Sequence, residues 1–162
     1  MPIVERLAGV FIEIVVLLFA VSAHESAHGW VADRWGDPTA RDLGRITLNP
    51  LKHVDPVGSL MVPALLAISG MPVFGWARPV PVNPLNLRDP RRAMVRVSFA
   101  GPAANLILAV ISLIGLRLLR MVAPGVPRLV IDNLSAGSVL GGGALGLVVA
   151  ILTSSLIINV IL

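Results

Sequence analysis

Two histidines and a glutamate have the residue types and spacing of a catalytic metal site: His24, Glu25 and His28. Residues four apart in an α-helix are separated by about 400° of rotation and about 6 Å of rise, so both imidazoles leave nearly the same face. Two such imidazoles can share one zinc ion, and a glutamate beside the ion can accept a proton from bound water. The pattern therefore predicts His24 and His28 as zinc ligands and Glu25 as the general base.

A catalytic zinc site also needs a third protein ligand, and the sequence restricts the choice. Glu25 is the last glutamate, and His53 is the only histidine that follows His28. The chain has no cysteine, which excludes thiolate ligands, disulfides and a cysteine nucleophile. Besides His53 there remain six aspartates, none of which is singled out by its spacing: Asp33, Asp37, Asp42, Asp55, Asp89 and Asp132.

The composition is that of an integral membrane protein. Of the 162 residues, 56% are hydrophobic and 14% are charged, and the mean hydropathy is +0.86. A soluble domain has about 25% charged residues, so a soluble globular fold is excluded. The thirteen basic residues are scattered, without a basic stretch interleaved with aromatics, so we expect a lipid bilayer around the chain and no nucleic-acid partner.

Four apolar segments approach the length of about 20 residues that a membrane-spanning helix needs. They are Leu7–Val31, Val57–Ala77, Val97–Leu116 and Asn133–Leu162. The sequence therefore predicts an all-α, polytopic transmembrane protein, with residues 1–162 forming a single membrane core.

The second apolar segment, Val57–Ala77, either crosses the membrane or enters and returns, because Pro63, Gly70 and Pro72 interrupt it. If it returns, nine of the thirteen basic residues lie on one side, between Asp33 and Arg96; if it crosses, the division is seven against six. Since basic residues concentrate on the cytoplasmic side, the sequence favours a re-entrant segment and a cytoplasmic 33–96 region.

Two short segments have extended character. Arg45–Asn49 alternates polar and apolar residues, and Arg78–Val82 has alternate prolines, which confine a segment to a sheet edge. They predict a small extended or β element at the membrane surface, either a paired ribbon or two unpaired loops. An edge strand there would hold an unwound substrate through its main chain.

Two further residues have competing interpretations. Asn105 follows Gly101-Pro102 by one helical turn, so its amide would contact a substrate carbonyl or an oxyanion, or bond to a neighbouring helix beside small residues. His53, with Asp55, would be a substitute or supporting ligand pair, or else an ordinary solvated loop histidine beside Lys52.

Five stretches together resemble the site-2 protease family of intramembrane zinc metalloproteases, in its small prokaryotic branch. They are His24–Trp30 (HESAHGW), Gly36–Ala40 (GDPTA), Gly44–Pro50 (GRITLNP), Phe74–Val82 (FGWARPVPV) and Ala100–Asn105 (AGPAAN). The resemblance implies a three-helix core, bound Zn²⁺ and a multi-pass location in the prokaryotic cytoplasmic membrane. It also implies substrates that span or are tethered to the membrane, cleaved near the cytoplasmic face.

The family's third zinc ligand comes from an Asp-Gly pair, and this chain contains none. We therefore expect the chain to be a fragment whose third ligand lies beyond Leu162, with weak zinc binding and little activity by itself. Two other function classes remain: a catalytically inactive zinc-binding membrane protein and an interaction module without metal. The glutamate between the two histidines argues against both, because metal binding alone would not need it.

Overall fold

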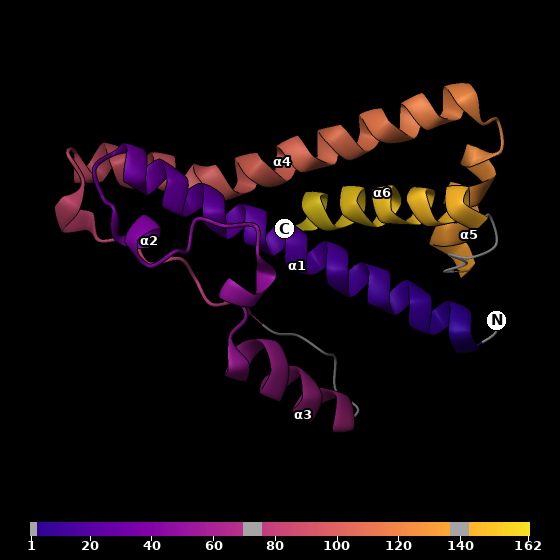
Figure 1. Ribbon diagram of the computed structural model, residues 1–162, viewed down its shortest axis with the longest axis horizontal. Helices are drawn as coiled ribbons and strands as arrows, with labels where there is room; N and C mark the ends of the chain where they lie inside the picture. The colour runs from indigo at the N-terminus through magenta and orange to yellow at the C-terminus, as the bar shows by residue number, and fades with distance from the viewer. Residues whose placement is uncertain (1–2, 70–75, 137–142) are drawn as a thin grey trace. The chain divides into compact units, whose positions relative to one another are not determined.

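The computed structural model describes residues 3–69, 76–136 and 143–162, and within these ranges every regular element is helical (Figure 1). The α-helices are α1 (Ile3–Arg34), α2 (Thr39–Asp42), α3 (Val62–Ile68), α4 (Pro90–Val122), α5 (Val126–Ala136) and α6 (Gly143–Ile161). Two 3₁₀ turns, η1 (Pro50–Lys52) and η3 (Pro84–Asn86), and a π-helical turn, η2 (Pro56–Met61), complete the order.

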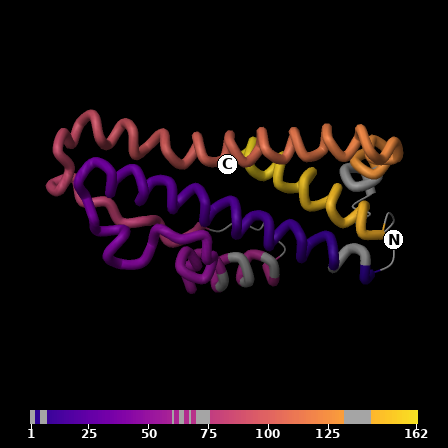
Figure 2. The backbone as a smooth tube through the Cα atoms, turned by 45° about the horizontal axis from the view of Figure 1, so that its top comes forward, coloured from indigo at the N-terminus to yellow at the C-terminus, as the bar shows by residue number. Residues whose placement is uncertain are grey.

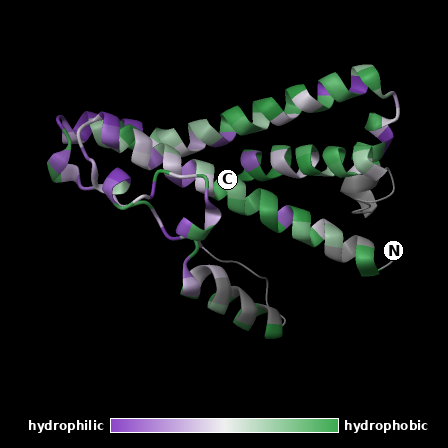
Figure 3. Cartoon of the chain, viewed as in Figure 1, coloured by the Kyte–Doolittle hydropathy of each residue, from purple (hydrophilic) through white to green (hydrophobic). Residues whose placement is uncertain are grey.

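Three of the described helices are long and apolar enough to cross a membrane: α1 over Ala8–Arg34, α4 and α6. Their outward residues include many large apolar side chains, as lipid-facing surfaces require, and Figure 3 shows hydrophobic residues along all three. The predicted all-α, polytopic membrane class is confirmed, and the chain is a multi-pass membrane protein.

The second predicted apolar segment contributes no spanning helix to the described part of the chain. From Pro56 to Ile68 it forms η2 and α3, 6 and 7 residues long, which together rise about 20 Å, against about 30 Å of hydrocarbon. Residues 70–75 lie outside the described ranges, so the re-entrant path stays a prediction.

The chain divides into two compact units, of which the first comprises residues 1–20 and 103–162. Its core joins Ile12 and Val16 of α1 to Ala150 of α6. The Ser112 hydroxyl on α4 donates to Ser155 Oγ on α6 over 2.9 Å, and Gly115 leaves room for Leu152. Small residues and hydroxyl pairs are what membrane helices use to associate, because lipid supplies no hydrophobic force between them.

The second unit comprises residues 21–102, in which the second half of α1 and the first half of α4 lie side by side (Figures 1 and 2). α1 ends at Arg34, and the chain turns at Gly36, whose φ of 107° favours glycine. The N–H of Asp37 donates to the Ala32 carbonyl and that of Gly36 to the Asp33 carbonyl, the two bonds of a Schellman motif. After this turn the chain reverses its direction and continues into α2.

The two predicted extended segments are unpaired loops rather than a ribbon. No strand occurs in the described residues, and Arg45–Asn49 and Ala77–Asn83 have no regular structure. Between Pro79 and Pro81 only Val80 has a backbone N–H, and that group bonds to a side chain instead of a strand. A segment without free donors cannot complete a ladder, which accounts for the missing β pairing.

Candidate metal centre and active site

His24, Glu25 and His28 come together on the second half of α1. One donor atom from each lies within 4.8 Å of the others, and the two imidazole centroids are 4.8 Å apart. Among the described residues this is the group of His, Asp and Glu side chains able to hold a metal ion. The helical spacing therefore places the three side chains together as predicted, while their roles as ligands and base stay predictions.

The ring of His28 is oriented by α4. Its Nδ1 lies 2.6 Å from the backbone carbonyl of Val97, and since a carbonyl only accepts, Nδ1 must donate. In the neutral ring Nε2 then holds the lone pair, which is the form that binds a metal. A carbonyl behind a ligating histidine is the usual way in which proteins fix the tautomer and the direction of the ring.

Gly101 on α4 faces both imidazoles. A Cβ at this position would lie 2.5 Å from Nε2 of His28 and closer still to Nε2 of His24. The two Nε2 atoms thus converge on a space that any side chain at Gly101 would fill. Two imidazole nitrogens and a carboxylate suit zinc, so the residues present fit this ion, with His24 and His28 as its ligands.

Glu25 is held by a segment distant in sequence. Its Oε2 accepts a 2.8 Å hydrogen bond from the backbone N–H of Val80. The bond fixes the carboxylate beside the histidines, because a backbone amide has a single direction in which it can donate.

Residues 78–83, here called the strap, lie across this part of α1 and are anchored at both ends. At the first end, the Arg78 N–H donates to the His53 carbonyl over 2.8 Å, and Nη2 of Arg45 donates to the carbonyls of Arg78 and Pro79. At the other end, the Asn83 N–H donates to Oδ2 of Asp37 over 2.6 Å. The Val80 N–H lies between the anchors, so both of them determine where it points.

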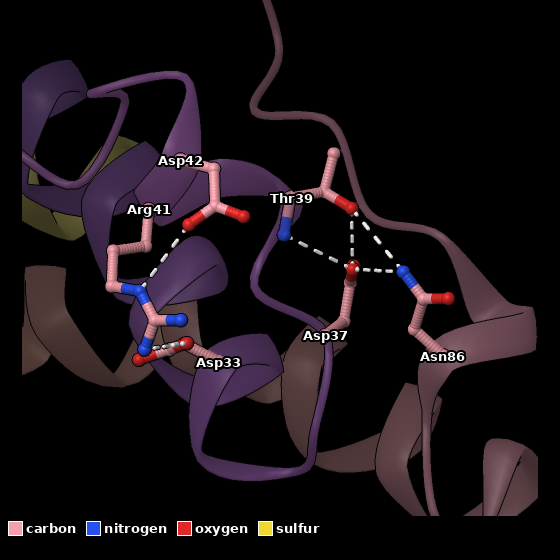
Figure 4. A network of polar contacts seen from close by, with 6 residues as sticks. All are labelled: Asp33, Asp37, Thr39, Arg41, Asp42 and Asn86. Carbon is pink, nitrogen blue, oxygen red and sulfur yellow. Dashed lines mark hydrogen bonds and ion pairs between the residues drawn. The ribbon is translucent and has the colours of Figure 1, made fainter.

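Asp37 is the centre of the second anchor (Figure 4). Its buried carboxylate accepts bonds from the Asn83 N–H, the N–H and hydroxyl of Thr39, and Nδ2 of Asn86. Burial by itself would raise the pKa of Asp37, but the hydrogen bonds from Thr39, Asn86 and Asn83 outweigh it and hold the pKa below its usual range. The carboxylate is therefore ionised at neutral pH, and it joins the end of α1 to the strap.

Arg45 is the buried cation of the first anchor. Burial and the neighbouring Arg78 lower the pKa of Arg45, whereas the Glu25 carboxylate raises it. An arginine lowered from its usual value is still charged at neutral pH, so Arg45 binds the strap carbonyls as a cation.

Ser26, inside the His-Glu-x-x-His stretch, attaches the 44–53 loop to α1. The Ser26 hydroxyl donates to the Thr47 carbonyl and accepts from the Thr47 N–H. The same carbonyl accepts from Nε2 of His53 over 2.9 Å. His53 is only 2% exposed, so the interpretation of His53 as a solvated loop residue is wrong: its ring is used to hold this loop.

The other candidates for the third ligand have separate structural contacts. Asp33 and Asp42 pair with Arg41, at 2.9 Å and 3.5 Å. Asp55 caps η2 through the N–H groups of Val57 and Gly58, and Asp89 accepts from the Arg92 N–H at the start of α4. Asp37 is bonded to the strap and to Thr39 and Asn86, and the side chain of Asp132 lies outside the described part of the structure. Neither His53 nor a described aspartate therefore joins His24, Glu25 and His28.

Asn105 lies on α4, one helical turn after Gly101, and its side chain is 1% exposed. Its predicted contact with a substrate stays a prediction. The sequence analysis gave no role at the centre to Gly101, Val80 or Arg45, and it considered Asp37 only as a zinc ligand. The available signal was that all four residues lie in the stretches that resemble the family.

The chain matches a peptidase family and is similar to proteins named as putative zinc metalloproteases. The sequence model of Peptidase family M50 matches residues 12–160. "Putative zinc metalloprotease YwhC" of Bacillus subtilis (strain 168) is 49% identical over 98 residues, which are 60% of this chain and 42% of that protein.

Two mycobacterial relatives, both named "Putative zinc metalloprotease Rip2", are also similar. The protein of Mycolicibacterium smegmatis is 40% identical over 107 residues, 65% of this chain and 40% of that protein. The protein of Mycobacterium tuberculosis (strain H37Rv) is 37% identical over 114 residues, 69% of this chain and 42% of that protein. The aligned part of this chain thus covers about two fifths of each of these relatives. No solved structure matches the chain.

Proposed function

The chain belongs to peptidase family M50, the site-2 protease family, and from this membership we propose that it is the zinc-binding core of an intramembrane endopeptidase. The observation that supports the proposal most is the convergence of both histidine Nε2 atoms on the space beside Gly101, with the Glu25 carboxylate next to them. Gly101 leaves open the space that both nitrogen atoms face, as a bound metal ion requires.

In the proposed mechanism, zinc when bound polarises the substrate carbonyl and makes the attacking water more acidic. His24 and His28 hold the ion, with a third ligand from outside the described residues. The Val97 carbonyl fixes the ring of His28 so that Nε2 would be the atom that binds the ion. Glu25 accepts the proton of the water and then gives it to the leaving amine nitrogen, while the Val80 N–H holds Oε2 in place.

The substrates proposed are proteins that span the membrane or are tethered to it. His24–His28 lies in the second half of the spanning part of α1, so cleavage occurs inside the bilayer, nearer to the 33–96 region than to the other side. By the distribution of basic residues this is the cytoplasmic side of the cytoplasmic membrane. Asn105 is proposed to contact the substrate carbonyl.

Replacing Glu25 by glutamine in the whole protein tests the proposal. Zinc should stay at the wild-type content, while cleavage of a transmembrane peptide carrying a fluorophore and quencher should fall about 10²- to 10⁴-fold, the usual contribution of a general base. Glu13→Gln, on the same helix, is the matched control and should keep the activity. His24→Ala should lose both zinc and activity.

Two results would contradict the proposal. Undiminished cleavage by Glu25→Gln would show that Glu25 is not the base. A wild-type protein that holds one zinc and cleaves no transmembrane peptide would favour the alternative, a catalytically inactive zinc-binding membrane protein.

A further inference from the structure

Three arginines line an open hollow at the start of α4. Arg91, Arg92 and Arg96, here called the arginine cluster, surround a volume of about 420 Å³ together with Val95. Arg92 and Arg96 are four residues apart, as are Arg91 and Val95, so the four side chains occupy neighbouring positions on one helical face. The helix thus presents three guanidinium groups to one space.

The positive charge of the cluster is poorly balanced within the protein. Arg92 pairs with Asp89 at 3.4 Å, but among the described residues no carboxylate lies within ion-pair distance of Arg91 or Arg96. The cluster also stands at a helix N-terminus, where the aligned peptide dipoles are positive and repel cations. An anion from outside the chain would relieve both unfavourable terms.

The cluster lies at the level where lipid headgroups are found. From Val97 to Leu116, α4 has twenty residues without a charge, which rise about 30 Å, the thickness of the hydrocarbon layer. The next arginines, Arg117 and Arg120, mark the opposite boundary, near the C-terminal end of the helix dipole. Arg96 is therefore the last residue before the hydrocarbon.

Two tryptophans lie at the same end of the second unit, each beside an arginine. The Arg96 guanidinium lies 4.7 Å from the ring centre of Trp35, and that of Arg34 lies 4.7 Å from the ring centre of Trp30. Tryptophan beside arginine is typical of the membrane interface, where an apolar ring and a polar edge are both accommodated. The stacking on Trp35 also fixes Arg96 beside the hollow.

We propose that the arginine cluster binds the phosphate of an anionic phospholipid headgroup, such as phosphatidylglycerol. Guanidinium groups recognise phosphate through paired, charge-assisted hydrogen bonds, and three of them at one hollow supply more donors than one phosphate needs. The hydrocarbon boundary at Val97 favours a lipid over a soluble anion, because a headgroup phosphate is held at that depth. The site fixes the depth of α4 in the bilayer and is independent of the proposed proteolysis.

The test compares two variants that each remove two charges from α4. R91Q/R96Q alters the cluster, and R117Q/R120Q, at the other end of the helix, is the matched control. Binding of fluorescent phosphatidylglycerol and of fluorescent phosphatidylcholine is measured with the whole protein, delipidated in nonionic detergent. We expect phosphatidylglycerol to bind the wild type and the control similarly and R91Q/R96Q at least about tenfold more weakly.

Two additional arms distinguish lipid binding from the binding of a soluble anion and from unfolding of a variant. R91K/R96K keeps the charges and should retain most of the binding. An unchanged elution volume in size-exclusion chromatography shows that each variant is folded. Inorganic phosphate at ~10 mM should displace less than half of the phosphatidylglycerol. Full displacement by phosphate, equal binding of both lipids to the wild type, or equal losses in the two double glutamine variants would each overturn the proposal.

Discussion

The backbone N–H of Val80 donates a 2.8 Å hydrogen bond to Oε2 of Glu25, although 55 residues separate the two. Val80 is the only residue between Pro79 and Pro81, so the strap presents a single amide at this point. The proposed general base is therefore oriented by a loop that belongs to neither α1 nor α4.

Replacing Val80 by proline should remove this donor and place the ring Cδ where the amide hydrogen pointed at Oε2 of Glu25, so the carboxylate loses both its bond and its position. The loss of a hydrogen bond to a charged group costs about 1.5–3 kcal/mol, so we expect kcat to fall about 10- to 100-fold with the zinc content unchanged. Val80→Ala keeps the N–H and is the matched control. Equal loss of kcat in both variants would mean that the side chain, not the amide, is what matters.

Replacing Gly101 by alanine should destroy the metal centre. The added Cβ would lie 2.5 Å from Nε2 of His28, in the space where both imidazoles converge, and the helical backbone of α4 cannot move away freely. We expect the bound zinc, measured by elemental analysis of the whole protein, to fall at least about tenfold. Gly125→Ala introduces a Cβ that has no atom within 4 Å and should leave the zinc content unchanged; a wild-type zinc content in Gly101→Ala would contradict this account of the site.

Asp37→Asn should destabilise the protein at neutral pH. The asparagine loses the charge that four donors satisfy, which costs about 1–3 kcal/mol and lowers Tm. Because the pKa of Asp37 is lower in the folded state than in the unfolded state, its stabilisation is present above the unfolded pKa and is lost as the pH falls through the folded pKa. The difference in Tm between wild type and variant should therefore be largest near pH 7 and shrink below about pH 4.

Asp42→Asn provides the control for that experiment. Asp42 is an exposed carboxylate whose only ion pair in the described structure is with the exposed Arg41, at 3.5 Å (Figure 4). Exposed pairs of this kind contribute about 0–1 kcal/mol, so Tm should change little. A difference between wild type and Asp37→Asn that did not depend on pH would show that the packing at Asp37, rather than its charge, stabilises the strap.

The features that follow from regular helix geometry could be predicted from the sequence. The spacing of His24 and His28 places both rings on one face because helix geometry is fixed over four residues, and the long uncharged run before Arg117 predicts a spanning helix in the same way. The family was recognisable because several such stretches occur in one chain. The prolines of the strap also predicted an extended segment, but not its partner.

Only the tertiary structure decided which distant residues meet. Nothing in the spacing of Gly101, Val80 or Asp37 connects them with His24, because long-range contacts depend on how helices and loops pack and not on a periodicity of 2 or 3.6 residues. The same holds for His53, whose neighbour Lys52 suggested solvent, while the fold buries its ring against the Thr47 carbonyl. The sequence determined the membrane class and the two histidines and glutamate of the centre. Only the packing of helices and loops showed that Gly101 leaves room beside the two rings and that the Val80 amide holds the carboxylate.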